Sequence, residues 1–210
     1  MITRLDPNGA GFYNPAQWVA SAGTKTACVD DGASANDADY ISGGDAGTQT
    51  QTFTMTDLPA GALAPSTMTL TARMKRDGGN YADGGLFWRS NSTNANVLKT
   101  ITGGSFSNLT DTRTTDPSGG GAWTAARTNA LECGVYFLSS FAGELVYCSW
   151  IKLDVTHEIG AGGFAFLIGS LAGAALGLHE MARLARHLHA KTKTLITPAE
   201  YEEAWREVRG

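Results

Sequence analysis

The chain has 210 residues, a net charge of −4, and 26 glycines. Its first 158 residues hold ten Lys and Arg against fifteen Asp and Glu, so the composition excludes the basic face that nucleic-acid binding needs. A chain of this length forms one domain with a single core, or one domain with an appendage. The N-terminal MITRLDPNGAGFYNP has no apolar stretch, so we expect no signal peptide.

Alternating side chains predict antiparallel strands from residue 48 onward. Residues 48–56, TQTQTFTMT, carry threonine at every second position. Residues 66–75, STMTLTARMK, repeat this pattern, with an inward face formed by Met68, Leu70, Ala72 and Met74. A period of two with threonine on one face is typical of strands that bury one side only.

Further short runs follow, and clusters of Gly, Asn, Ser and Asp separate them. They cover residues 84–90, 95–101, 131–138 and 144–155. Many short strands with such turns predict a mainly β fold, an antiparallel β-sandwich of jelly-roll-like type over residues 1–157. In the last run both faces begin apolar, which predicts a central strand.

The three cysteines, Cys28, Cys133 and Cys148, lie far apart in the sequence. An odd number without CxxC spacing is neither a disulfide framework nor a zinc signature. Cys133 and Cys148 could pair across neighbouring strands, but the pattern favours ordinary buried thiols.

The C-terminal region has a different pattern. Residues 159–178 are twenty residues without a charge, and no proline interrupts residues 158–193. We therefore predict a long hydrophobic helix over 158–194, with Gly169, Gly173 and Gly177 on one packing face. Thr197-Pro198 then starts a short amphipathic helix within 195–210, whose docking stripe includes Tyr201, Trp205 and Val208.

Two environments suit the hydrophobic segment. Its length matches a bilayer crossing, and the basic residues that follow it would place the C-terminus in the cytoplasm. Equally, a glycine-lined helix can be buried by copies of itself in a bundle. In either environment the helix would serve anchoring and assembly.

The segment CVDDGASANDADYI brings four aspartates together: Asp30, Asp31, Asp37 and Asp39. Clustered carboxylates can bind Ca²⁺, but this spacing does not fit the calcium-loop pattern, and a solvated acidic turn is favoured. The four histidines belong to the helical region, and no nucleotide-binding or catalytic motif occurs. We therefore expect no metal, no cofactor and no enzymatic activity.

Four residues are candidates for a sugar-binding surface. These are Trp88, Arg89, Asn91 and Trp123. Aromatic faces stack on pyranose rings, and Asn and Arg side chains hydrogen-bond to hydroxyls. The alternative for a tryptophan in a sandwich strand is packing in the core, which is the commoner outcome.

Several stretches, taken in order, resemble a known class of module. They are Trp18 and Gly23, NDADYI, FTMTDLP, MTLTARMKR and DPSGGGAWT. Over residues 1–155 the chain resembles β-sandwich modules of structural proteins of tailed bacteriophages. The resemblance implies a virion component such as a decoration, fibre or tail protein, oligomeric and without enzymatic activity.

These observations together predict a non-enzymatic structural component of a phage particle, in the capsid or tail. Its sandwich would face outward, and its C-terminal helix would anchor it and drive assembly. The expected partners are copies of itself and other particle proteins, with a lipid membrane and a host glycan as further candidates. The alternative is a membrane-anchored carbohydrate-binding adhesion module.

Overall fold

The computed structural model describes residues 1–44, 47–77, 83–101, 103–139 and 144–159. Within these ranges the chain forms eleven strands and one short helix. The strands are β1 (Ile2–Leu5), β2 (Pro7–Ala10), β3 (Trp18–Ala20), β4 (Ile41–Gly44), β5 (Gly47–Met55), β6 (Thr67–Asp77), β7 (Asp83–Ser90), β8 (Thr93–Thr100), β9 (Ser107–Arg113), β10 (Glu132–Ser139) and β11 (Leu145–Thr156). The helix is α1 (Ala125–Asn129).

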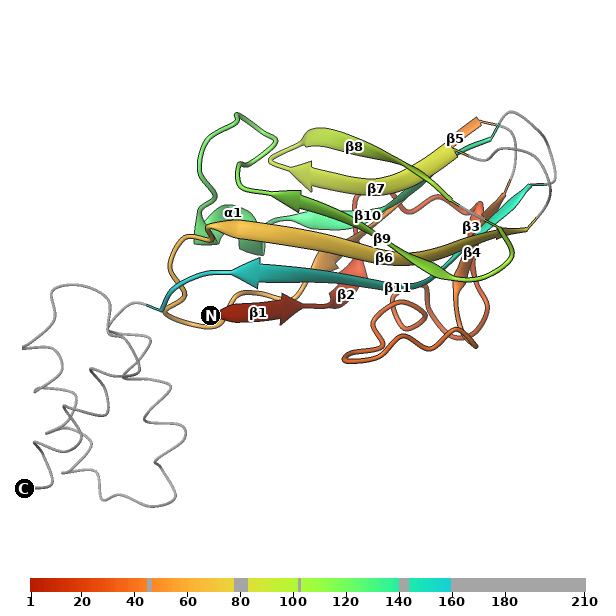
Figure 1. Cartoon of the computed structure of the whole chain (residues 1–210), viewed down its shortest axis with the longest axis horizontal. Helices are drawn as coiled ribbons and strands as arrows, with labels where there is room; N and C mark the ends of the chain where they lie inside the picture. The colour runs from red at the N-terminus through yellow and green to blue at the C-terminus, as the bar shows by residue number, and fades with distance from the viewer. Residues whose placement is uncertain (45–46, 78–82, 102, 140–143, 160–210) are drawn as a thin grey trace, which may run out of the picture. The chain divides into compact units, whose positions relative to one another are not determined.

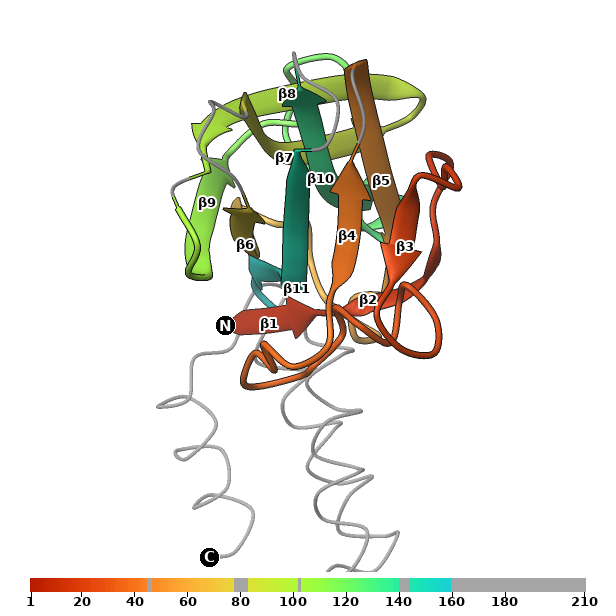
Figure 2. The same ribbon diagram turned by 90° about the vertical axis from the view of Figure 1, so that its right-hand side faces the viewer.

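The strands form two antiparallel sheets that lie in two layers (Figures 1 and 2). The six-stranded sheet has the order β3-β4-β11-β6-β9, with β1 also paired to β11. The five-stranded sheet has the order β2-β5-β10-β7-β8. The predicted antiparallel β-sandwich is confirmed. The predicted central position of the strand at 144–155 is also confirmed, because β11 pairs with β4, β6 and β1.

The alternating pattern of the sequence fills the space between the sheets. On β6 the predicted inward residues Met68, Leu70, Ala72 and Met74 are completely buried. From the other sheet, Phe53 of β5 and Val135 of β10 are also fully buried. Removing apolar surface from water stabilises the fold by about 25 cal/mol per Å². One face of β5, of β6 and of β10 is thereby buried in the core.

The sequence pattern missed four strands, β1, β2, β3 and β9. Three of them lie at sheet edges, and β1 pairs only with β11. They are short or polar, as in PNGA and SNLTDTR, and the burial of β9 alternates only between exposed and intermediate. Edge strands bury less apolar surface than central ones, so their sequences carry a weaker alternation.

All three cysteines are free and buried. Cys133 lies on β10 and Cys148 on β11, which belong to different sheets. Burial raises the pKa of both thiols. The prediction of buried thiols is confirmed, and the alternative pairing of Cys133 with Cys148 on neighbouring strands is wrong.

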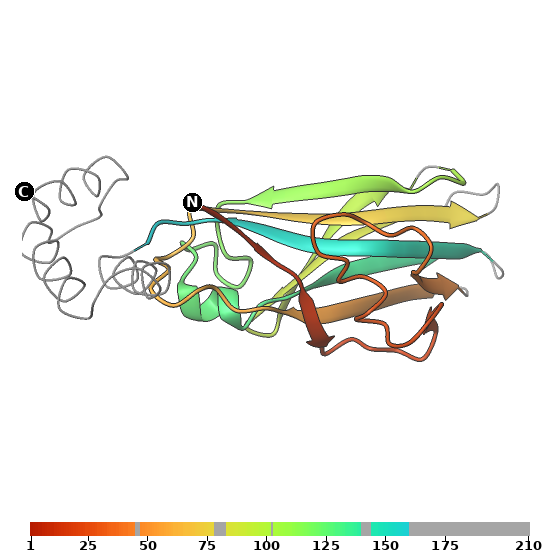
Figure 3. The same cartoon turned by 90° about the horizontal axis from the view of Figure 1, so that it is seen from below.

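Residues 21–40 follow β3 as a long loop, which crosses β11 in Figure 3. The N–H of Ile151 donates to the carbonyl of Val29 at 3.0 Å. The carboxylate of Asp37 accepts two bonds from the Arg73 guanidinium, at 2.8 and 2.7 Å, and one from the Ser149 hydroxyl. The acidic segment is thus tied to the outer face of the six-stranded sheet. In the described ranges no group of three or more metal-ligating side chains forms.

Contacts divide the chain into two compact units. The sandwich comprises residues 2–58 and 65–156. The other unit comprises Met1, residues 59–64 and residues 157–210. Within it, the N-terminal ammonium donates to the carbonyl of His157 at 2.9 Å, and the N–H of Leu63 donates to the carbonyl of Glu158 at 2.8 Å.

The predicted helices over 158–194 and 195–210 lie outside the described residues, apart from residues 158 and 159. The same holds for the predicted packing glycines and the docking stripe (Gly169, Gly173, Gly177, Tyr201, Trp205 and Val208). Among the helices of the described part, none has the length and apolar character of a membrane span.

A buried carboxylate organises the loop before α1. The Asp116 side chain is fully buried and forms an ion pair with Arg127. It also accepts from the N–H and the hydroxyl of Ser118, at 2.8 and 2.9 Å. Burial acts to raise the pKa of this carboxyl, but the bonds from Ser118 and Arg127 outweigh it and lower the pKa to about 2. The charged form is therefore the one that the loop stabilises.

Because folding lowers the pKa of Asp116, its contribution to stability is present above pH 4 and is lost as the pH falls from about 4 through about 2. We expect Asp116→Asn to lower the free energy of unfolding at pH 7 by on the order of 1 to 2 kcal/mol, with the difference from wild type vanishing near pH 2. Urea unfolding at a series of pH values measures this. A difference that stays constant over the same range would contradict it.

Candidate functional site

The outward face of the five-stranded sheet carries small and polar side chains next to a few aromatic ones. The strand register sets them in rows. Thr52, Gly134, Phe87 and Asn96 are neighbours across β5, β10, β7 and β8. The next row contains Thr54, Glu132, Arg89 and Asn94. The same alternation that buries one face of these strands leaves this second face free to form a site.

Residues 11–17, which we call the strap, connect β2 to β3 and run along this face. The Gly11 N–H donates to the Thr52 carbonyl at 2.9 Å, and the Thr52 N–H donates to the Tyr13 carbonyl at 2.8 Å. The Tyr13 N–H donates to the Thr52 hydroxyl at 3.0 Å. The strap thus extends the pairing of β2 with β5 before Pro15, which has no N–H, interrupts it.

The Glu132 carboxylate joins the strap to the sheet. One oxygen, Oε2, accepts from the Phe12 N–H at 2.7 Å and from the Thr52 hydroxyl at 2.8 Å. The other, Oε1, accepts from the Arg89 guanidinium at 3.1 Å. The side chains of Arg89 and Glu132 are 17% and 14% exposed, so this pair is screened much less than a surface pair.

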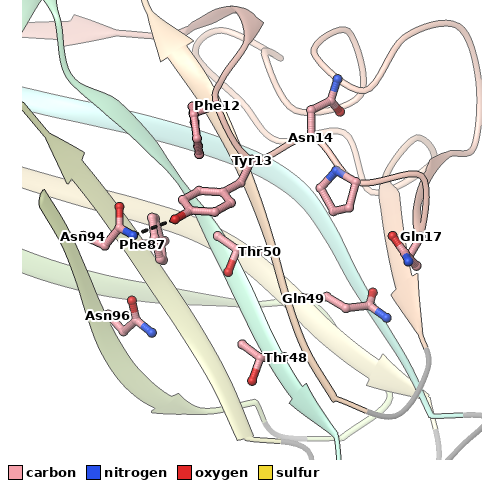
Figure 4. A pocket seen from close by; sticks show the side chains of 11 residues that line it. Phe12, Tyr13, Asn14, Gln17, Thr48, Gln49, Thr50, Phe87, Asn94 and Asn96 are labelled. Atoms are coloured by element: carbon pink, nitrogen blue, oxygen red, sulfur yellow. Dashed lines mark hydrogen bonds between the residues drawn. The ribbon is translucent and has the colours of Figure 1, made fainter. Parts of the chain in front are cut away.

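Three aromatic rings are arranged edge to face from the strap to the sheet. Phe12 and Tyr13 have ring centroids 5.0 Å apart, and Tyr13 and Phe87 are 5.5 Å apart. The Tyr13 hydroxyl accepts a bond of 2.7 Å from the Asn94 amide, shown dashed in Figure 4. The Arg89 guanidinium lies 4.1 Å from the ring centroid of Phe12, a residue that remains 67% exposed.

An open pocket of about 830 Å³ lies between the strap and the sheet (Figure 4). It is lined by Phe12, Tyr13, Asn14, Pro15, Gln17, Thr48, Gln49, Thr50, Phe87, Asn94 and Asn96. The volume lies within the range of small-molecule sites, roughly 300 to 1,000 Å³. The lining combines aromatic rings with amides and hydroxyls, and among its described residues none is Asp, Glu, Lys, Arg or His. Such a surface offers apolar faces and hydrogen-bond donors and acceptors without charge.

The structure separates the four residues predicted to contact a sugar. Trp88 and Trp123 are 0% and 1% exposed, with ring centroids 6.2 Å apart. Neither ring can stack on a sugar, so the prediction of glycan contact is wrong for both, and core packing is correct. Trp88 points inward because it alternates with Phe87 on β7. The indole N–H of Trp88 donates to Asp111 at 2.9 Å.

Arg89 and Asn91 remain at the surface, but neither lines the pocket. Arg89 lies at its rim, held by Glu132 and stacked on Phe12. Asn91 and Ser92 form the two-residue turn between β7 and β8, with φ values of 46° and 66°. Two successive positive φ values are what a type I′ hairpin turn requires. The role of Asn91 in this structure is therefore to turn the chain.

Sequence reasoning missed the strap and the asparagines of β8. Phe12, Tyr13, Asn14 and Pro15 are consecutive, and Asn94 and Asn96 alternate along β8. An aromatic pair before Asn-Pro, and amides at every second position of a strand, are signals that could have been noted. Nothing in the sequence, however, indicates that the strap crosses the face to which the β8 asparagines belong.

No protein-family model and no curated protein matches the sequence. Solved structures do. A family 16 carbohydrate-binding module is 15% identical, with a TM-score of 0.36 over 56% of this chain and 77% of that chain. The xylan-binding domain of Xyn10C from Paenibacillus barcinonensis is 11% identical, with a TM-score of 0.37 over 72% and 96%. The cyclase Fisc from Fischerella sp. is 15% identical, with a TM-score of 0.41 over 74% and 85%.

These findings correct the prediction of a structural component of a phage particle. Five of the similar structures carry titles of carbohydrate-binding modules, or of an enzyme that contains one. No comparison bears on the resemblance to bacteriophage modules. At these low identities and TM-scores, the ligand of this chain has to be inferred from its own pocket.

Glu132 offers a test of how the strap is held. Replacing it by Ala leaves the Arg89 guanidinium and the Phe12 N–H without their shared partner. We expect Glu132→Ala to lower the free energy of unfolding by about 2 kcal/mol. The matched control is Asp154→Ala, which breaks the more exposed pair with Lys152 and should cost less than about 1 kcal/mol. Urea unfolding measures both, and equal losses would contradict the role given to Glu132.

Proposed function

We propose that this chain binds an uncharged carbohydrate in the pocket between the strap and the five-stranded sheet. The observation that carries the proposal is the lining itself, in which aromatic rings lie next to amides and hydroxyls. A sugar ring has apolar C–H faces and a rim of hydroxyls. Aromatic side chains can cover the faces while amide side chains donate to and accept from the hydroxyls.

The pocket has both kinds of group within reach of one another. Tyr13 and Phe12 present rings on the strap side, and Asn94 and Asn96 present amides from β8 (Figure 4). The Tyr13 hydroxyl is oriented by the amide of Asn94. A ring fixed by edge-to-face packing and a hydrogen bond loses little freedom when a ligand binds, and such preorganisation favours affinity.

The described residues of the lining carry no charge, and this indicates the chemical class of the ligand. The Arg89 guanidinium, which lies over the ring of the lining residue Phe12, is paired with Glu132. A carboxylated or sulfated chain would find no free cation among the described lining residues, and its charge would have to be desolvated without compensation. A neutral polysaccharide meets no such cost.

The same lining favours binding over cleavage. Glycoside hydrolysis ordinarily needs two carboxyl groups that flank the scissile bond, one to donate a proton and one to act as base or nucleophile. In the part of the lining that the structure describes, no residue is Asp or Glu. The carboxylate of Glu132 is occupied by three donors at the rim. We therefore propose a binding module without catalytic activity.

Native gels that contain a soluble polysaccharide test the proposal. We expect the full chain to be retarded by at least one neutral polymer among hydroxyethyl cellulose, arabinoxylan and galactomannan, but not by carboxymethyl cellulose. Tyr13→Ala and Asn96→Ala should each weaken binding to the polymer that retards the wild-type chain by about tenfold, which corresponds to about 1.4 kcal/mol. Tyr147→Ala, on the outward face of the other sheet, is the control and should bind like wild type.

Two results would contradict the proposal. One is a wild-type chain that none of the neutral polymers retards. The other is retardation that Tyr13→Ala and Asn96→Ala leave unchanged, which would place binding elsewhere on the molecule. Thermal unfolding of each variant checks that a loss of binding does not follow from a loss of fold.

A further inference from the structure

Lys25 lies in the loop that follows β3, and its ammonium contacts the strap at Asn14 and Pro15. The Nζ atom donates to the Asn14 side-chain oxygen at 2.8 Å and to the Pro15 carbonyl at 2.7 Å. It also donates to the Gln51 side-chain oxygen at 3.1 Å. Lys25 does not itself line the pocket, whereas Asn14 and Pro15 do.

The three acceptors match the three N–H donors of the ammonium. All of them are neutral oxygens, and no carboxylate of the described ranges forms an ion pair with Lys25. Burial lowers the pKa of the ammonium, in agreement with a charge that is partly withdrawn from water. An exposed lysine would remain hydrated and mobile; this one is fixed by three contacts.

The third acceptor connects the strap to the core. Gln51 lies on β5 and is completely buried. Its amide nitrogen donates to the Thr52 carbonyl at 2.9 Å, so its oxygen is the end left for Lys25. Without the ammonium this buried oxygen would lose its partner, and the strap would lose its link to the sheet at Pro15.

We infer that Lys25 is a positioning residue of the pocket, which holds the middle of the strap, at Asn14 and Pro15, against β5. Glu132 holds the strap on the other side of Tyr13, at Phe12. With the strap fixed on both sides of Tyr13, this residue stays above Phe87 with its hydroxyl at Asn94. The inference rests on the proposed function for its effect on affinity, but its effect on the strap does not depend on any ligand.

The test uses the full chain with Lys25→Met, Lys25→Arg and, as a control, Lys152→Met on the outward face of the six-stranded sheet. Methionine keeps the length of the side chain and removes its donors, whereas arginine keeps the charge and several donors. In gels with the three neutral polymers, we expect Lys25→Met to weaken binding by about tenfold. Lys25→Arg should keep most of the wild-type affinity, and Lys152→Met should bind like wild type.

Amide hydrogen exchange followed by mass spectrometry supplies a measurement without ligand. Lys25→Met should speed exchange in peptides that cover residues 11–17, and Lys25→Arg should restore protection there. Peptides of β6 should exchange alike in all the variants, which shows that the core is intact.

The outcomes separate the two proposals. If wild type binds none of the polymers, the proposed function fails, and exchange in the strap still decides whether Lys25 positions it. If wild type binds but Lys25→Met binds equally and exchanges equally, the role of Lys25 is overturned while the proposed function stands. The role of Lys25 would also be overturned if Lys25→Met and Lys25→Arg both weakened binding while hydrogen exchange in the strap stayed unchanged.

Discussion

The candidate site depends on one interaction, the sharing of the Glu132 carboxylate by three donors. A carboxylate so largely withdrawn from water has to be paired and hydrogen-bonded, or its burial would cost several kcal/mol. Here the three donors come from the strap, β5 and β7. Satisfying one charge therefore fixes the strap to two strands of the sheet, and the pocket exists because the strap is fixed.

The pocket shows how charged groups can shape a neutral surface. Glu132, Arg89 and Lys25 hold the strap, yet none of them lines the pocket. Arg89 and Glu132 form an ion pair with each other, and the Lys25 ammonium donates to neutral oxygens. The lining is left to rings, amides and hydroxyls. A ligand that enters would meet preorganised groups without having to compete with an ion pair.

The tryptophans illustrate why residue type alone was a poor guide to this site. Trp88 and Trp123 were plausible sugar contacts by their chemistry, but each lies on the inward side and is buried. Phe87, the neighbour of Trp88, is the residue that β7 turns toward the pocket. One step along a strand reverses the face to which a side chain belongs. The sequence around residues 87 and 88 is apolar on both faces, so its alternation could not distinguish them.

The sequence by itself determined the sandwich, because the alternation in β5 and β6 and the apolar content of β11 can be satisfied only by strands that bury one or both faces. It also determined that the thiols are buried. The tertiary structure decided the site. The strap, Glu132 and β8 lie far apart in the chain, and only the pairing of β5, β10, β7 and β8 brings them to one face. Strand order and register arise from long-range contacts, which local patterns of residues do not encode.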